Sequence, residues 1–145
     1  MVKFICGEKG SGKTKKLIEM SNADIKAGNG NIVFVAIDHN HIFSLDYLVR
    51  LINAMEFNIE DIESFYGFLC GILSMDYDLD KVYVDGIYKL IKIEKKDIDY
   101  LIEKLNLLSE KFGVDFYIGL GVGSDYKLKQ IPYKSSEYII EVAGD

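Results

Sequence analysis

Hydrophobic residues along this chain form short β-prone runs and longer stretches with helical spacing, and the two kinds alternate. The runs Val2–Cys6, Ile32–Ile37 and Val114–Leu120 are rich in β-branched and aromatic residues and predict strands. The stretches Lys15–Ile25 and Asp97–Phe112 carry apolar residues on one face and predict helices. The run at Ile32 has no polar break, which is typical of a parallel strand buried on both faces. Helices should therefore cover both faces of the sheet.

A further helix is predicted over Ile59–Leu73, where apolar residues again recur at helical spacing. Gly67 and Gly71 lie inside it and lower helix stability, so we expect them to be required by close packing against the sheet. Near the end of the chain, Gly119–Gly123 follows a strand without a convincing helix after it and is interpreted as permissive loop backbone. The run Tyr138–Val142 predicts a final edge strand.

The segment 42–58 allows two interpretations. Apolar residues over Leu45–Met55 fit the spacing of a helix, whereas the run around Leu48–Ile52 fits a short strand. We favour a short strand near Arg50–Asn53. The chain then alternates strands and helices from beginning to end, with no repeat and no linker. The expected fold is one α/β domain over residues 1–145, a three-layer αβα architecture with a mostly parallel sheet of about five strands.

Composition narrows the classes of function. The chain has 145 residues, 49% of them hydrophobic, and a formal net charge of −6, so disorder and broad nucleic-acid binding are both disfavoured. No apolar run approaches the roughly 20 residues of a membrane-spanning helix. Cys6 and Cys70 lie in apolar surroundings without a C-x-x-C spacing, which is typical of buried thiols in a reducing compartment. We expect a soluble, cytoplasmic protein without a zinc site.

The first candidate for chemistry is the stretch Gly7–Thr14, which directly follows the first predicted strand and precedes the first predicted helix. It has the complete phosphate-loop pattern, in which glycines let backbone N–H groups approach a phosphate. The lysine of the pattern would bind the outer phosphates, and its threonine would ligate Mg²⁺. The residues expected to bind the nucleotide are Gly7, Glu8, Lys9, Gly10, Ser11, Gly12, Lys13, Thr14 and Lys15.

The second candidate is Asp85, which ends the short β-prone run Lys81–Val84. A strand that ends in aspartate downstream of a phosphate loop is the usual form of the second nucleotide motif, whose carboxylate holds Mg²⁺ or its water. The alternative is a simple Asp-Gly turn with Gly86. The acidic segment Met75–Asp80 lacks the glycine and glutamate of a calcium loop and is interpreted as a solvated connection.

The two motifs at residues 7–14 and 82–85 resemble those of the phosphate-loop NTPase superfamily, and the layout of the chain is similar to that superfamily over most of its length. The small size and the loop sequence also resemble short bacterial ATP-binding proteins of the twitching-motility type. A more distant resemblance is to thymidine kinase, although the cysteine zinc lasso is absent and Gly86 stands where that family has glutamate. These resemblances imply a nucleoside triphosphate and Mg²⁺ as ligands. Because no Asn/Thr-Lys-x-Asp motif occurs, ATP is favoured over GTP.

Residues that orient the attacking water are harder to identify. Asp38 and His39 follow the second predicted strand, at the sheet edge where ligands bind in open α/β sheets, and together with Lys13 they are the candidate catalytic residues. Alternatively they only cap the strand. Arg50 is the sole arginine and could act as an arginine finger, although an ordinary surface role is the simpler interpretation.

Three functions from different classes fit these residues. The leading one is a MgATP-binding hydrolase with slow turnover that couples its nucleotide state to a protein partner or to further copies of itself as a homo-oligomer. The second is a nucleoside-type small-molecule kinase, whose usual cationic lid a chain with one arginine supplies poorly. The third is a non-catalytic nucleotide-binding switch or scaffold, because no glutamate follows Asp85.

Overall fold

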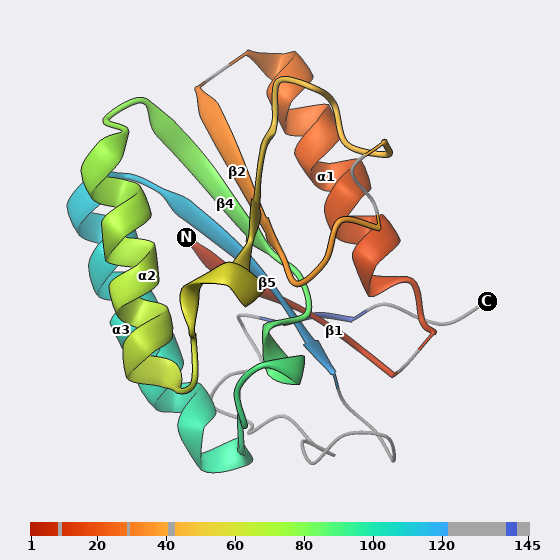
Figure 1. Ribbon diagram of the computed structural model, residues 1–145. Helices are drawn as coiled ribbons and strands as arrows, with labels where there is room; N and C mark the ends of the chain where they lie inside the picture. Colours follow the sequence, from red (N-terminus) through yellow and green to blue (C-terminus); the bar gives the residue numbers. More distant parts are fainter. Residues whose placement is uncertain (9, 29, 41–42, 122–138, 142–145) are drawn as a thin grey trace.

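The computed structural model describes the chain apart from residues 9, 29, 41–42, 122–138 and 142–145. Strands and helices alternate through most of the described part, as the pattern of apolar residues predicts (Figure 1). The exception is the pair of strands Asn31–Ala36 and Arg50–Asn53, which follow each other with no helix among the described residues between them. The strands are β1 (Val2–Gly7), β2 (Asn31–Ala36), β3 (Arg50–Asn53), β4 (Leu79–Val84), β5 (Asp115–Gly121) and β6 (Ile139–Glu141). The helices are α1 (Lys13–Ala27), α2 (Ile62–Met75) and α3 (Lys95–Phe112), with short 3₁₀ turns η1 (Ala54–Phe57) and η2 (Ile87–Lys89).

The described strands form one sheet of six strands in the order β3-β2-β4-β5-β1-β6, and each of its pairings is parallel. This confirms the expected α/β fold, with one strand more than the expected five and no antiparallel member among the described strands. Because all strands run the same way, their carboxyl ends meet at one edge of the sheet. The two candidate motifs, after β1 and after β4, therefore lie at the same edge, with only β5 between their strands.

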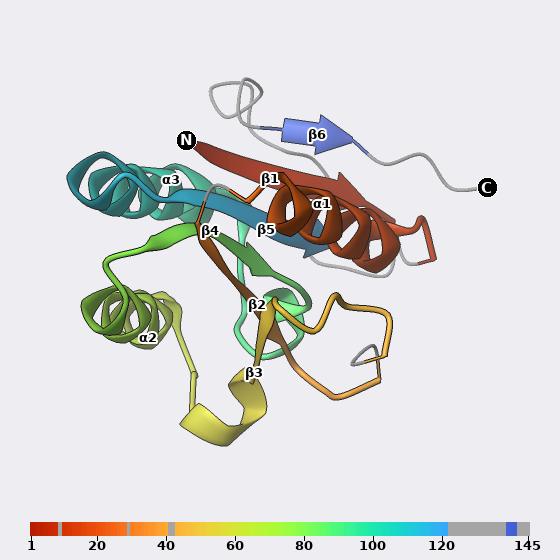
Figure 2. The ribbon, with the colours of Figure 1, turned by 90° about the horizontal axis from the view of Figure 1, so that it is seen from above.

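The sheet is covered on both faces, which gives three layers. Helix α1 packs on one face, and α2 and α3 lie side by side on the other (Figures 1 and 2). Neighbouring residues of a strand serve opposite layers: Ile5 packs in the cluster that contains Leu17 of α1, whereas Phe4 packs in the cluster that contains Leu69 of α2 and Leu101 of α3. Burial on both faces explains why the strands read as apolar runs instead of alternating patterns.

The segment 42–58 contains β3 at Arg50–Asn53, so the prediction of a short strand there is confirmed and the alternative helix over Leu45–Met55 is wrong. The turn η1 follows, and Asn53 caps it by accepting a hydrogen bond from the Met55 amide at 3.0 Å. The last predicted strand is also confirmed: β6 pairs with β1 at the edge of the sheet. Residues 42 and 124–138 belong to the part of the chain outside the described residues.

The predicted helices are present, with shifted ends. Helix α2 begins at Ile62 instead of Ile59 because Asp61 caps it, accepting a hydrogen bond from the Ser64 amide at 2.8 Å. The expectation of close packing at Gly67 and Gly71 is wrong, since a β-carbon at either position would meet no atom within 4 Å. In α3, the predicted face is buried except at its end, where Phe112 is 43% exposed.

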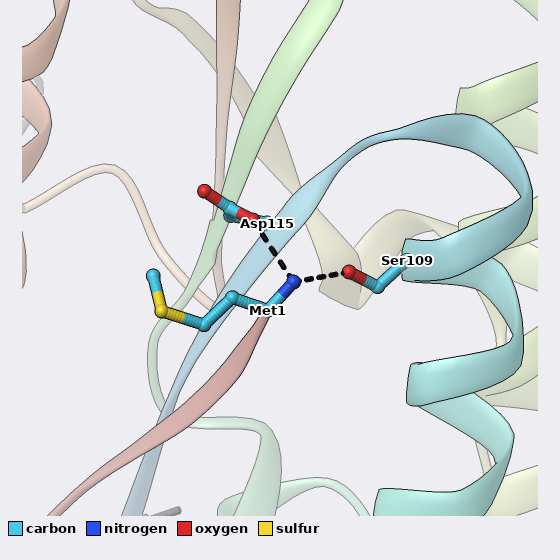
Figure 3. Close-up of polar contacts among 3 residues, drawn as sticks. All are labelled: Met1, Ser109 and Asp115. Carbon is cyan, nitrogen blue, oxygen red and sulfur yellow. Dashed lines mark hydrogen bonds and ion pairs between the residues drawn. The ribbon is translucent and has the colours of Figure 1, made fainter.

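The start of β1 is held between α3 and β5. Figure 3 shows the amino group of Met1, which donates a hydrogen bond to the hydroxyl of Ser109 and lies 3.0 Å from a carboxylate oxygen of Asp115. The Met1 carbonyl accepts a hydrogen bond from the Phe116 amide at 2.9 Å. These contacts help to hold β1 in register beside β5. They therefore help to set the position along the sheet at which β1 ends and the loop begins.

The remaining findings concern thiols and membranes. Cys6 is buried, Cys70 is half-buried, and neither forms a disulfide. Within the described residues, none of the helices has the length and apolar character needed to cross a membrane.

Candidate phosphate-binding site

The loop between β1 and α1 bends through two glycines. Gly10 and Gly12 adopt positive φ values of 78° and 96°, a left-handed conformation that only glycine adopts at little cost. The Ser11 amide donates to the Glu8 carbonyl at 3.1 Å and closes the turn. Helix α1 therefore begins directly at Lys13, two residues before its predicted start, and the N–H groups of its first turn are at the loop. Lys9 lies outside the described residues.

Lys13 points back into this loop and is buried, with 5% of its surface exposed. Its Nζ atom donates hydrogen bonds to the carbonyl oxygens of Gly7 and Glu8, each at 2.9 Å. Burial lowers the pKa of the Lys13 ammonium, an effect that the charge of Asp85 partly offsets and the charge of Lys89 reinforces. A buried cation held by backbone carbonyls next to a helix N-terminus is a strong point of attraction for an anion.

The two predicted motifs meet through Thr14 and Asp85. The Thr14 hydroxyl, in the first turn of α1, donates a hydrogen bond to Asp85 Oδ2 at 2.9 Å. The Asp85 amide donates to the Val35 carbonyl of β2 at 2.8 Å, which extends the sheet by one residue beyond β4 and holds the backbone of Asp85 in place. A hydroxyl and a carboxylate side by side are oxygen donors of the kind that Mg²⁺ prefers.

Gly119 of β5 explains how Asp85 reaches Thr14 although β5 lies between β4 and β1. A β-carbon at Gly119 would lie 3.3 Å from a methyl carbon of Leu17 and 3.7 Å from Asp85 Oδ1. The missing side chain leaves this space to the carboxylate. The sequence assigns Gly119 both to the strand Val114–Leu120 and to the start of a loop. The strand assignment is confirmed and the loop assignment is wrong at this residue, because β5 continues to Gly121 and pairs Gly119 with Ile5. A glycine inside a strand signals such a close approach.

Ser11 supplies an independent indication that the loop receives a ligand. Its hydroxyl oxygen is buried and has no hydrogen-bond partner among the residues that the structure describes. A buried hydroxyl without a partner is costly, and most such groups in native proteins bind a ligand or an ordered water. Ser11 lies between the two left-handed glycines, at the centre of the predicted phosphate-binding segment.

Asp38 and His39 follow β2 and therefore lie at the same sheet edge as Asp85. Asp38 accepts hydrogen bonds from the Asn40 amide at 3.0 Å and from its side-chain Nδ2 at 3.2 Å. The exposed His39 ring has its Nε2 atom 3.3 Å from the side-chain nitrogen of Asn53. These contacts are those of strand-capping residues, the alternative interpretation of the two side chains.

Tyr88 and Lys89 lie near Lys13, a proximity that the sequence motifs do not predict. They lie in η2, directly after the left-handed Gly86, so the Asp-Gly turn signal was present and pointed to this change of direction. The Nζ atom of Lys13 lies 5.8 Å from the centroid of the Tyr88 ring, and the Nζ atom of Lys89 lies 6.0 Å from it. The turn therefore brings a second cation to the phosphate loop.

Two other basic residues contribute less. Lys15 is exposed in the first turn of α1, beside the loop. Arg50 is exposed at the beginning of β3, the edge strand separated from β1 by β2, β4 and β5. The beginning of a parallel strand faces away from the edge that carries the loop. Within one copy of the chain, Arg50 therefore lies away from the predicted phosphate site.

The described residues contain no group of three or more histidine, cysteine or acidic side chains placed to hold a metal ion. No protein-family model matches the chain, and no curated protein is significantly similar to it in sequence.

Proposed function

We propose that this protein binds MgATP in the loop Gly7–Thr14 and hydrolyses it slowly. The observation that carries the proposal is the 2.9 Å hydrogen bond between the Thr14 hydroxyl and Asp85, formed beside the buried Lys13. A glycine-rich turn that binds no ligand would not require a buried lysine. A simple Asp-Gly turn would not require a contact with α1, the helix after β1. The joint arrangement is that of a site for phosphate and Mg²⁺.

The loop supports the phosphate half of this proposal. The left-handed Gly10 and Gly12 keep side chains out of the bend, so backbone N–H groups can approach phosphate oxygens. Lys13 neutralises charge on the outer phosphates, and the start of α1 adds its positive dipole end. The Ser11 hydroxyl, which has no partner among the described residues, gains one when a phosphate oxygen enters the loop.

Thr14 and Asp85 support the metal half. Bound Mg²⁺ would neutralise the charge that develops on the transferred phosphoryl group. The Thr14 oxygen is the direct ligand expected from the phosphate-loop pattern, and the Asp85 carboxylate holds the ion or one of its waters. Because the two side chains are already hydrogen-bonded to each other, little rearrangement is needed when the metal enters.

Turnover also requires a group that orients water, for which Asp38 and His39 are the candidates. They follow β2, which is the direct neighbour of β4, the strand that precedes Asp85. Each carboxylate oxygen of Asp38 accepts one hydrogen bond from Asn40 and has a further lone pair that a water could use. Because no glutamate follows Asp85, we expect slow hydrolysis in the isolated protein, and a partner that completes the site would accelerate it.

Binding and turnover are tested together by calorimetric titration of ATP and GTP with and without Mg²⁺, followed by measurement of phosphate release. We expect Mg²⁺-dependent ATP binding that is stronger than GTP binding. Lys13→Ala and Asp85→Ala should abolish turnover, whereas the matched exposed variants Lys16→Ala and Asp78→Ala should not change it. Failure of the wild-type protein to bind ATP at millimolar concentration would overturn the proposal.

A second candidate function is a nucleotide-dependent switch without catalysis. It is favoured by one observation: Asp85 is followed by Gly86, so no glutamate stands directly after the predicted metal-binding aspartate. Tight MgATP binding with no phosphate release, unchanged by Asp38→Ala or His39→Ala, would establish the switch and exclude the hydrolase.

A further inference from the structure

The turn after Asp85 places a second lysine at the predicted phosphate site. Strand β4 ends at Val84, and Gly86 takes a left-handed conformation with φ 77°. A β-carbon at Gly86 would lie 3.1 Å from a side-chain carbon of Ile37, so the chain turns closely against the residue that follows β2. This turn starts η2 and directs it back along the carboxyl edge of the sheet.

The turn η2 is anchored firmly enough to hold side chains in place. Ile87 is fully buried in the core cluster shared with α2 and α3. The Lys89 amide donates to the Gly86 carbonyl at 2.9 Å, and the Leu90 amide donates to the Ile87 carbonyl at 2.9 Å. Tyr88 is half-buried and Lys89 is exposed. The exposed lysine therefore extends from a rigid base.

We propose that Lys89 is a second phosphate-binding cation of this site, which contacts the terminal phosphate of a nucleoside triphosphate and makes the site prefer triphosphate to diphosphate. This inference rests on the proposed function of the loop Gly7–Thr14. Lys89 lies outside both predicted phosphate-site motifs, so the chain itself would supply a cation that neither motif contains.

Geometry supports the assignment because Lys13 and Lys89 approach one aromatic ring. Their Nζ atoms lie 5.8 Å and 6.0 Å from the centroid of Tyr88. Lys89 is close enough that its charge lowers the pKa of Lys13. Two ammonium groups near one ring repel each other. The charge of Asp85 offsets part of this repulsion at Lys13, and a phosphate beside the two lysines would offset more of it.

The different burial of the two lysines separates their roles. Lys13 is held inside the loop by the carbonyls of Gly7 and Glu8, so it faces phosphates that lie within the loop. Lys89 is exposed, and a lysine side chain has a flexible four-carbon stem. It reaches the end of the phosphate chain that projects farthest from the loop, which is the terminal phosphate.

Other lysines near this edge do not share this arrangement. Lys92 lies 2.8 Å from a carboxylate oxygen of Glu94, and Lys96 lies 3.5 Å from the other oxygen of that carboxylate. Lys89 has no ion-pair partner among the described residues. Its charge is therefore available to a ligand.

The experiment compares the affinities of ATP and ADP, each with Mg²⁺, by calorimetry for the wild type, Lys89→Ala, Lys89→Arg and the control Lys96→Ala. We expect Lys89→Ala to weaken ATP binding about tenfold, the size of one contact to a charged group, and ADP binding less than about twofold. Lys89→Arg keeps the charge and should restore most of the affinity for ATP. Lys96→Ala should match the wild type.

The outcomes separate this inference from the proposed function. If the wild type binds ATP, Lys13→Ala does not, and Lys89→Ala binds ATP like the wild type, the role of Lys89 is overturned and the phosphate loop stands. Equal weakening of ATP and ADP by Lys89→Ala also overturns the terminal-phosphate assignment. If the wild type binds neither nucleotide, the phosphate loop itself fails. A circular dichroism spectrum and thermal midpoint equal to those of the wild type exclude misfolding of the variants.

Discussion

The Thr14 hydroxyl donates a hydrogen bond to the Asp85 carboxylate at 2.9 Å, across a separation of 71 residues in the chain. The strands that precede these residues are not neighbours, because β5 lies between β1 and β4. The bond forms because both residues extend from the carboxyl edge of the sheet and because Gly119 of β5 leaves room beside the Asp85 carboxylate. The proposed Mg²⁺ site is thus organised by strand order as much as by sequence motifs.

Removal of the Thr14 hydroxyl should uncouple nucleotide binding from Mg²⁺. Thr14→Val keeps the shape of the side chain but offers no oxygen to the metal. We expect the variant to bind ATP without Mg²⁺ about as well as the wild type and to lose most of the gain in affinity that Mg²⁺ provides. Titration of ATP at several Mg²⁺ concentrations measures this gain. Thr14→Ser retains the hydroxyl and should behave like the wild type, so equal Mg²⁺ dependence in Thr14→Val and Thr14→Ser would contradict the assignment.

A side chain at Gly119 should disturb the same site from β5. A β-carbon there lies 3.3 Å from Leu17 and 3.5 Å from the Val84 carbonyl, so Gly119→Val overpacks the space beside Asp85. We expect the free energy of unfolding to fall by about 1–3 kcal/mol, as is typical of overpacking. Because Asp85 is displaced, the Mg²⁺-dependent part of ATP affinity should fall as well. Urea unfolding and ATP titration measure the two effects, and unchanged Mg²⁺ dependence would show that Gly119 has a packing role only.

The two motifs could be identified in the sequence because each is local: a strand is followed at once by the candidate ligand-binding residues. The loop Gly7–Thr14 and Asp85 needed no knowledge of how strands pair. The roles of Gly119 and Lys89 depend on which strand lies between β1 and β4 and on how the turn after Asp85 folds back. Such relationships are non-local, so a single sequence read along its length shows them only as a glycine in a strand and a lysine after an Asp-Gly turn.

The same limit explains the wrong expectation for Gly67 and Gly71 of α2, and it leads to a stability prediction. Both glycines are exposed, and a β-carbon at either would meet no atom within 4 Å. Gly67→Ala and Gly71→Ala should therefore each raise the free energy of unfolding by about 0.5–1 kcal/mol through higher helix propensity. Urea unfolding of the single variants and of the double variant measures this. A loss of stability would indicate that another molecule packs closely against this face of α2.

A buried tyrosine predicts how stability depends on pH. The Tyr83 hydroxyl, on the face of the sheet covered by α1, donates a hydrogen bond to the Asp24 carboxylate of α1, which also lies 3.2 Å from the Lys81 ammonium. Burial raises the pKa of Tyr83 far above its usual range, and the hydrogen bond to Asp24 and its charge raise it further. Burial also raises the pKa of Tyr117, whose ring stacks on Tyr83 at 4.8 Å between centroids.

The sign of the effect follows from the protonation of the unfolded chain. Below pH about 10 tyrosines are protonated in both states, so the full stability is present. Above pH about 10 the unfolded chain loses the Tyr83 proton while the folded protein keeps it, so the free energy of unfolding falls by up to about 1.4 kcal/mol per pH unit. Tyr83→Phe should cost about 1 kcal/mol at neutral pH through the lost hydrogen bond and should make the alkaline decline less steep. Tyr117 and Lys81, whose pKa values are also raised in the folded protein, contribute to the decline that remains. Urea unfolding at pH 7 to 11 measures both effects.

Tyr47→Phe, at a position that is 90% exposed, is the matched control and should leave the pH dependence unchanged. An equally steep decline in Tyr83→Phe and the wild type would show that the Tyr83 proton is not held by the fold.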